Sequence, residues 1–212
     1  LMPLKFIQNK NGGFMDGALR ALEYAIDNGA LISNNSWGGD GYSEAMELLI
    51  ADLAGRGHIV VASAGNGGGD RIPDNNDIVG HFPSGYASEN VISVAAIDQT
   101  GALTSVSNYG PTSVDVAAPG RDVLSTTTGG SSGWKSGTSM AAPHVAGVVA
   151  LLRSARPELS PSEVRQIIIN SAQVDDRHRN LTVSGGYVDA ASALQLAVAG
   201  SPTTTAAPAT TA

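Results

Sequence analysis

Short runs of apolar residues recur along the chain and alternate with stretches of helical periodicity. The runs cover residues 4–7, 30–33, 59–62, 91–96 and 114–118. Between the first two runs, one helical face consists of Ala18, Leu19, Leu22, Ala25 and Ile26. Asn28 and Gly29 then form a typical helix stop. Strands that alternate with helices in this way predict an α/β fold with a mainly parallel central sheet.

Local signals predict further helices. A second helix is expected over residues 43–57, with one apolar face made by Met46, Leu49, Ile50 and Leu53. In the stretch SPSEV, Ser160 is a cap, Pro161 suits the first turn and Glu163 completes a capping box, which predicts a helix through about Ala172. A last helix is expected after Asp189.

Composition predicts one globular domain and a short tail. The chain has 212 residues, of which 42% are hydrophobic and 15% are charged, an ordinary globular balance. Residues 1–200 are expected to form the domain. From residue 201 to 212 the chain reads SPTTTAAPATTA, a Thr/Pro/Ala tract that cannot bury a core. We therefore expect a disordered tail or linker there.

Charge and cysteine content exclude several classes of function. The net charge of −7, without any run of Lys or Arg, argues against a nucleic-acid partner. The absence of cysteine excludes disulfides, zinc-thiolate sites and thiol catalysis. No apolar run approaches the ~18 residues of a membrane span. The expected protein has no nucleic-acid partner and no membrane span, and is a monomer.

The stretch SGTSMAAPHVAG, residues 136–147, combines a serine with very little side-chain bulk. One interpretation of Ser139 is a helix N-cap, a role that serine commonly takes. The other is a nucleophile, because Gly137 and Thr138 permit a tight helix entry, with Pro143 expected in the first turn. The N–H groups at a helix start also stabilise negative charge that develops nearby.

Four motifs, in the same order as in the family, resemble the subtilisin-like serine proteases, or subtilases. GTSMAAPHVAGVVALL resembles their serine motif, and NNSWGG resembles their substrate-binding strand. VVASAGN resembles their oxyanion-hole segment, and SNYGPTSVDVAAPG resembles the strand that leads back to the core. The resemblance covers nearly all of residues 1–200. It implies a three-layer αβα fold and a serine endopeptidase acting on proteins or peptides, with no cofactor required for the chemistry.

The resemblance implies two catalytic residues. Ser139 would be the nucleophile. Asn66 would donate its amide to the oxygen that becomes negative, since a short amide at the end of a sheet strand suits that task. An alternative for Asn66 is a turn residue, because GNGGG is rich in turn formers.

The resemblance also implies a substrate-binding strand and pocket. An exposed strand edge with small side chains can pair with an extended peptide. The residues expected to bind substrate and to wall the primary specificity pocket are Ser36, Trp37, Gly38, Ser63, Ala64 and Gly65. Core packing is the alternative for Trp37. The uncharged walls predict a broad or apolar preference, and the aromatic-Pro pair Phe82-Pro83, which relatives carry beside this pocket, is expected to be cis.

The sequence departs from the family pattern in its catalytic base. His144 is expected to be structural, and His58, His81 and His178 lack the family's histidine context. Nothing resembles the family's Asp block, and the family places both blocks ahead of the segment where this sequence starts. We therefore expect the triad Asp and His to come from a segment before Leu1, with little activity in the 212 residues alone. The alternative is a catalytically inactive, subtilase-like module that binds peptides.

Metal binding and location are weakly marked in the sequence. No loop of alternating acidic positions stands out, and GGGDRIPDNND reads equally well as a solvated loop, so no metal ligand is assigned and a structural calcium ion stays open. Secretion is expected from the habit of the family, the Thr/Pro/Ala tail and the NLT sequon at Asn180.

Overall fold

The computed structural model describes residues 1–7 and 12–199, so the tail predicted at 201–212 lies outside the described residues. Its main sheet has the order β1-β2-β3-β4-β8-β7. The bounds are β1 (Ile32–Asn35), β2 (Ile59–Ser63), β3 (Val91–Ile97), β4 (Val116–Pro119), β7 (Gln173–Val174) and β8 (Gly186–Tyr187). All neighbours pair in parallel except β7, which is antiparallel to β8. The prediction of a mainly parallel sheet is confirmed.

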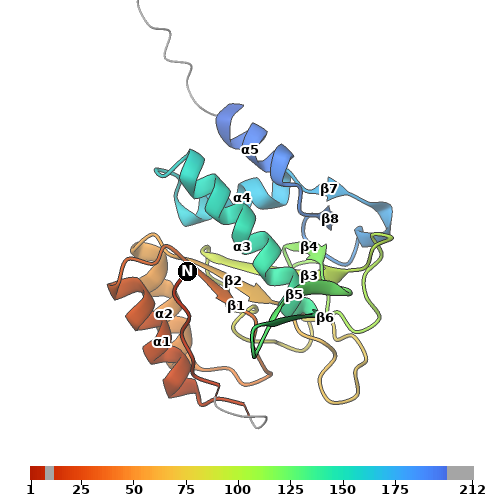
Figure 1. The fold of residues 1–212 in the computed structure, drawn as a ribbon. Coiled ribbons are helices and arrows are strands. Elements are labelled where there is room, and N and C mark those ends of the chain that lie inside the picture. Colours follow the sequence, from red (N-terminus) through yellow and green to blue (C-terminus); the bar gives the residue numbers. More distant parts are fainter. Residues whose placement is uncertain (8–11, 200–212) are drawn as a thin grey trace, which may run out of the picture.

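Helices cover both faces of this sheet (Figure 1). On one face lie α1 (Met15–Asp27) and α2 (Glu44–Gly55). On the other lie α3 (Thr138–Ala155), α4 (Pro161–Asn170) and α5 (Ala190–Ala199), while the 3-10 helix η1 (Asp176–His178) precedes β8. The three-layer αβα arrangement is therefore confirmed.

Alternation along the strands builds the two cores. Val60 on β2 points toward α1 and α2, where it packs in a cluster with Leu22, Met46 and Ile50. Its neighbours Ile59 and Val61 point the other way and pack in the cluster that α3 shares with α4 and α5. Because successive strand residues face opposite sides, a strand buried on both faces needs the continuous apolar run seen in the sequence.

Side-chain caps fix the starts of two helices, of which the sequence predicted the second. Ser43 precedes α2, and its Oγ accepts a hydrogen bond from the N–H of Met46 at 3.3 Å. Ser160 and Glu163 form the predicted capping box at the start of α4. Among the described residues, no helix is both long enough and apolar enough to cross a bilayer.

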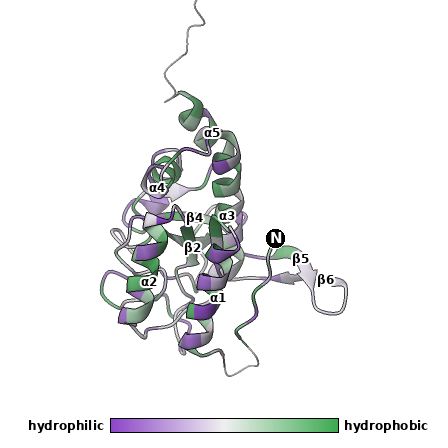
Figure 2. Cartoon of the chain, turned by 90° about the vertical axis from the view of Figure 1, so that its left-hand side faces the viewer, coloured by the Kyte–Doolittle hydropathy of each residue, from purple (hydrophilic) through white to green (hydrophobic). Residues whose placement is uncertain are grey.

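Two features differ from the sequence-based expectation. An antiparallel hairpin of β5 (Val123–Thr127) and β6 (Ser131–Lys135) projects from the body of the molecule (Figure 2) and was not predicted. The strand expected at residues 4–7 is wrong, because that segment joins no ladder in the described structure. Its Phe6 packs edge-on against Trp37, with ring centroids 5.0 Å apart.

Candidate active site

Ser139 is the second residue of α3 and is not its cap. The cap is Gly137, whose φ of 141° lies in a region that favours glycine. Pro143 lies inside the helix, so the expectation that it occupies the first turn is wrong. Because proline has no N–H, the carbonyl of Ser139 lacks its helical partner. The Oγ of Ser36 donates to that carbonyl instead, at 2.7 Å.

A second hydrogen bond ties the same two serines together. The Oγ of Ser139 donates to the carbonyl of Ser36 at 3.3 Å. Ser139 is half-buried, so its hydroxyl stays within reach of a ligand. The expected nucleophile therefore lies directly against the expected substrate strand, although the two are far apart in the sequence.

Asn66 is fixed by the residue before Ser139. Its Oδ1 accepts from the N–H of Thr138 at 2.9 Å and from the Oγ1 of Thr138 at 3.2 Å. An N–H group must meet the oxygen of the amide rather than its nitrogen, so these bonds set the orientation of the amide. Thr138 is fully buried, whereas Asn66 is exposed. The Nδ2 group is thus turned away from Thr138, as a donor to a ligand must be.

The two segments expected to bind substrate lie side by side. Strands β1 and β2 pair in parallel with Asn35 opposite Ala62, so residues 36–38 follow β1 at the same end of the sheet at which residues 64–65 follow Ser63, the last residue of β2. Ser63 and Ala64 are buried, with 3% and 0% of their surface exposed. Trp37 donates from its Nε1 to the Oδ1 of Asn35 at 3.2 Å, which fits the packing role considered for its ring.

A third segment, the loop that contains Phe82, packs beside the segment that follows β1. The Phe82-Pro83 bond is cis, as predicted. Phe82 exchanges two backbone hydrogen bonds with Gly39, at 3.0 and 2.8 Å, which join its loop to the substrate strand. His81 thereby comes to lie against Gly38. Sequence reasoning missed this position for His81, although its neighbour Phe82 had been assigned to the border of the pocket.

Comparison with known proteins agrees with this geometry. A family profile described as "Subtilase family" matches residues 1–194. The chain belongs to the subtilase family. The subtilase chain is 40% identical over 172 residues to "Thermophilic serine proteinase" of Bacillus sp. strain AK1. The matched region covers 81% of this chain and 40% of that protein. It is 41% identical over 182 residues to "Extracellular protease" of Xanthomonas campestris pv. campestris, covering 82% of this chain and 30% of that protein.

Solved structures show the same relationship for the subtilase fold. A protease of Pseudoalteromonas arctica superposes with a TM-score of 0.77 at 31% identity, covering 90% of this chain and 61% of that one. The prenylagaramide maturation protease PagA gives a TM-score of 0.76 at 27% identity, covering 91% and 71%. The subtilase chain thus spans less than half the length of the two curated relatives compared above.

The histidines of the subtilase chain bond elsewhere than to Ser139. His58 is buried, and its ring nitrogens bond to the carbonyl of Ala30 and the Oγ of Ser33, each at 2.9 Å. Burial lowers the pKa of His58. The Nδ1 of His144 bonds to the carbonyl of Met140 within α3 at 2.9 Å.

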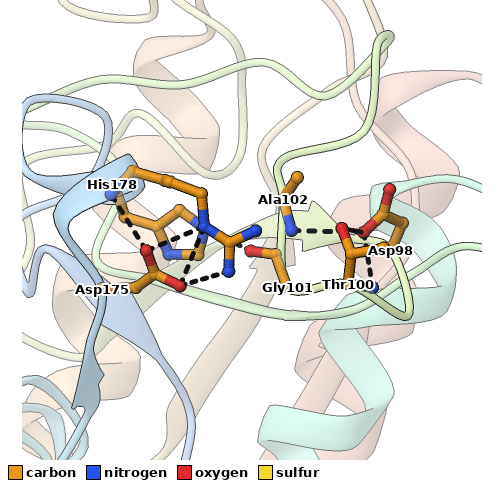
Figure 3. Close-up of polar contacts among 7 residues, drawn as sticks. Asp98, Thr100, Gly101, Ala102, Asp175 and His178 are labelled. Carbon is orange, nitrogen blue, oxygen red and sulfur yellow. Dashed lines mark hydrogen bonds and ion pairs between the residues drawn. The ribbon is translucent and has the colours of Figure 1, made fainter.

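The other buried histidine, His178, joins the helix η1 to a turn at Gly101. The Nε2 of His178 reaches the carbonyl of Gly101 at 2.8 Å (Figure 3). Gly101 lies in a turn that Asp98 organises by accepting hydrogen bonds from the N–H groups of Thr100 and Ala102, at 2.8 and 3.2 Å. His178 is therefore committed to the packing of η1 and lies outside the candidate site.

Two carboxylates of the loop at residues 67–77 form hydrogen bonds within the subtilase chain. Asp70 accepts from the N–H of Ile72 at 2.9 Å, and Asp77 accepts from the Oγ of Ser113 at 2.5 Å. Both carboxylates therefore accept hydrogen bonds from neighbouring groups of the protein. Within residues 1–7 and 12–199, no three acidic or histidine side chains gather as metal ligands would.

Proposed function

We propose that the protein containing this chain is a serine endopeptidase that hydrolyses peptide bonds through an acyl-enzyme at Ser139. The observation that carries the proposal is the approach of three elements: the start of α3, the amide of Asn66 and the segment that begins at Ser36. This combination suits acyl transfer, because a nucleophile, an anion-stabilising donor and a peptide-binding edge meet at one place.

The proposed reaction uses these groups in order. The Oγ of Ser139 attacks the carbonyl carbon of the substrate, and its proton passes to a base. The oxygen that becomes negative accepts hydrogen bonds from the Nδ2 of Asn66 and the N–H of Ser139. The tetrahedral intermediate then expels the amine, which takes the proton from the base. Water, deprotonated by the same base, then attacks the acyl-enzyme. The second tetrahedral intermediate breaks its bond to the Oγ of Ser139, which takes the proton back from the base, and the carboxylic acid product leaves.

The base is proposed to be a histidine, held by an aspartate, from a segment of the whole protein that precedes Leu1. Two observations support this. Each of the four histidine rings in this chain bonds to groups other than Ser139. The curated relatives are also much longer than the part of them that this chain matches.

The substrates are proposed to be proteins or peptides, bound in extended form along residues 36–38. Ser63, Ala64 and Gly65 would form the opposite wall of the primary pocket. Serine acyl transfer of this kind needs no cofactor. Secretion is proposed because the Xanthomonas relative is named an extracellular protease and Asn180 of the NLT sequon is exposed.

Peptide hydrolysis tests the proposal. The complete protein should cleave an unfolded protein such as casein, and Ser139→Ala should abolish cleavage while leaving the circular dichroism spectrum unchanged. A catalytically inactive peptide-binding module is the alternative, in which no segment of the complete protein supplies a base to Ser139. Binding of unfolded casein without cleavage by the complete protein would establish that alternative.

A further inference from the structure

Four hydrogen bonds form a chain along one face of β1 and continue into the segment that follows it. The Nε1–H of Trp37 donates to the Oδ1 of Asn35 at 3.2 Å, and the Nδ2 of Asn35 donates to the Oγ of Ser33 at 2.9 Å. The Oγ of Ser33 meets the Nε2 of His58 at 2.9 Å. The Nδ1 of His58 meets the carbonyl of Ala30, also at 2.9 Å. The chain can follow the strand because alternate residues of an extended backbone face the same side.

Donor and acceptor chemistry gives this chain a single direction. The carbonyl of Ala30 can only accept, so the Nδ1 of His58 carries a proton and the Nε2 of the neutral ring is an acceptor. Burial is the largest influence on the pKa of His58 and lowers it, so the ring is neutral at neutral pH. The hydroxyl of Ser33 therefore donates to His58 and accepts from Asn35. The amide of Asn35, with its oxygen toward Trp37 and its nitrogen toward Ser33, is fixed in one orientation.

The residues after Asn35 lie beyond the paired part of β1. The ladder between β1 and β2 ends at Asn35, so residues 36–38, here called the substrate-binding segment, extend past it. Side chains hold the start of this segment. Ser36 and Ser139 exchange two hydrogen bonds, and Trp37 is tied back to Asn35. Asn35 has only 3% of its surface exposed, whereas Trp37 is half-buried, so the indole is anchored from the interior of the protein.

We propose, on the basis of the function proposed above, that Asn35 is a positioning residue for the substrate-binding segment. It acts through Trp37, whose indole it holds at a fixed place relative to β1. The backbone of Ser36 lies between these two residues and is therefore confined by their bond. Because a misplacement of ~1 Å at a distance from the chemistry can lower a rate by ~10²-fold, this bond matters for catalysis although Asn35 itself is buried.

Kinetics of Asn35→Leu in the complete protein test the proposal. Leucine has a similar volume but accepts no hydrogen bond from Trp37. With a fluorogenic peptide that the wild-type protein cleaves, kcat/KM should fall ~10–100-fold. The loss should lie chiefly in KM, because the segment contacts the substrate backbone in the ground state and the transition state alike. An unchanged KM in Asn35→Leu would refute the positioning role.

A matched control separates positioning from a general loss of stability. Asn90 is also buried, and its Nδ2 donates to the carbonyls of Ile50 and His58 at 3.1 and 3.0 Å. It directly precedes β3, at the end of the sheet opposite to the substrate-binding segment. Asn90→Leu should leave KM near the wild-type value. An equal rise of KM in both variants would show that Asn35 only stabilises the fold.

A double-mutant cycle shows whether Asn35 acts through Trp37. Trp37→Phe removes the same hydrogen bond from its other end and keeps an aromatic ring. In the Trp37→Phe background, Asn35→Leu should change kcat/KM by no more than ~2-fold, because the bond is already lost. Full additivity of the two losses would overturn the proposal, since changes at independent sites add.

The indole N–H of Trp37 provides a spectroscopic readout. The complete protein is isotope-labelled and carries Ser139→Ala to prevent self-digestion, and the Trp37 signal is assigned by its absence from Trp37→Phe. Asn35→Leu should move the indole proton signal upfield, because the N–H loses its acceptor. Asn90→Leu should leave the signal in place. A signal that does not move in Asn35→Leu contradicts the proposal.

These measurements distinguish the positioning role from the proposed function. If the wild-type protein cleaves the peptide and Asn35→Leu cleaves it with the same kcat/KM, only the role of Asn35 fails. If the wild-type protein cleaves neither the peptide nor casein, the proposed function fails and the positioning role falls with it. Circular dichroism identifies misfolding. Should Asn35→Leu not fold, Asn35→Ser takes its place, because its shorter side chain remains polar but does not reach the indole of Trp37.

Discussion

Replacing Asn108 by alanine should impair catalysis without removing any group that touches substrate. The Oδ1 of Asn108 accepts from the N–H of Gly67 at 2.7 Å and from the N–H of Asp74 at 3.1 Å. Its Nδ2 donates to the Oδ1 of Asn76 at 3.0 Å. Asn108 thus fixes the backbone immediately after Asn66, the proposed oxyanion donor.

The second amide of this pair fixes the other side of the donor. The Nδ2 of Asn76 donates to the carbonyl of Ala64 at 2.8 Å. Asn76 and Asn108 are both buried, with 7% and 2% of their surface exposed. Together they hold the backbone on both sides of Asn66, so a loosened Asn108 should let the amide of Asn66 move relative to Ser139.

The size of the effect follows from the bonds that are lost. Asn108→Ala leaves three groups without their partner: the N–H of Gly67 and the Oδ1 of Asn76, which are buried, and the half-buried N–H of Asp74, which water can still reach and which is therefore not counted in the cost. At ~1–3 kcal/mol for each unsatisfied group, the variant should lose about 2–6 kcal/mol of unfolding free energy. Loss of a whole oxyanion donor costs ~10²–10³ in kcat, so its misplacement should cost ~10–100-fold. KM should change little, because the substrate strand is intact.

A matched control removes the general effect of lost stability. Asn90 is another buried amide, whose Nδ2 donates to the carbonyls of Ile50 and His58 at 3.1 and 3.0 Å, at the opposite edge of the sheet from Ser139. Asn90→Ala should destabilise the protein by a similar amount and leave kcat near the wild-type value. Steady-state kinetics well below both melting temperatures decide the matter. Equal losses of kcat in the two variants, or a loss confined to KM in Asn108→Ala, would refute the positioning role.

Three further predictions concern single side chains. Asn66→Ala should lower kcat of the complete protein by ~10²–10³ at nearly constant KM, whereas a change in KM alone would mark Asn66 as a binding or turn residue. Arg165 forms a salt bridge of 2.8 Å with the buried Asp115, so Arg165→Met should cost ~3–5 kcal/mol in urea unfolding; a cost below 1 kcal/mol would contradict this. Burial lowers the pKa of His58, so folding disfavours protonation of its ring. The stability that the neutral ring contributes should be fully present above pH ~6.5, and it should be lost progressively as the pH falls from there to the folded-state pKa. Melting temperatures from pH 8 to 5 test this, and His58→Gln should flatten the decline.

Much of the fold was predictable because its signals are local. Continuous apolar runs marked β2 and β3, and the pair Ser160 and Glu163 marked the start of α4. The hairpin of β5 and β6 escaped prediction because its Ser, Thr and Gly residues carry little of the alternation that marks a half-buried strand. Residues 4–7 were misassigned for the opposite reason: their apolar run is a local signal, whereas a strand needs a partner for its backbone groups.

The candidate site divides in the same way. Ser139, Asn66 and Ser36 were predicted through their motifs, and the structure brings them together. The contact of His81 with Gly38 and Gly65 was not predictable from a motif, since it depends on how three loops from distant parts of the sequence meet. The replacement of the missing helical bond at Pro143 by Ser36 likewise depends on tertiary structure.

Covalent labelling of Ser139 tests the central claim most directly. The complete protein is treated with a fluorophosphonate, and the adduct is located by intact-mass analysis and peptide mapping. We predict one adduct, on Ser139, that is absent from Ser139→Ala. We also predict labelling that is orders of magnitude slower in the isolated 212-residue chain, because an unassisted serine hydroxyl is a weak nucleophile. Rapid labelling of the folded 212-residue chain would place the base among its own four histidines, and no labelling of Ser139 in the complete protein would contradict the proposed endopeptidase.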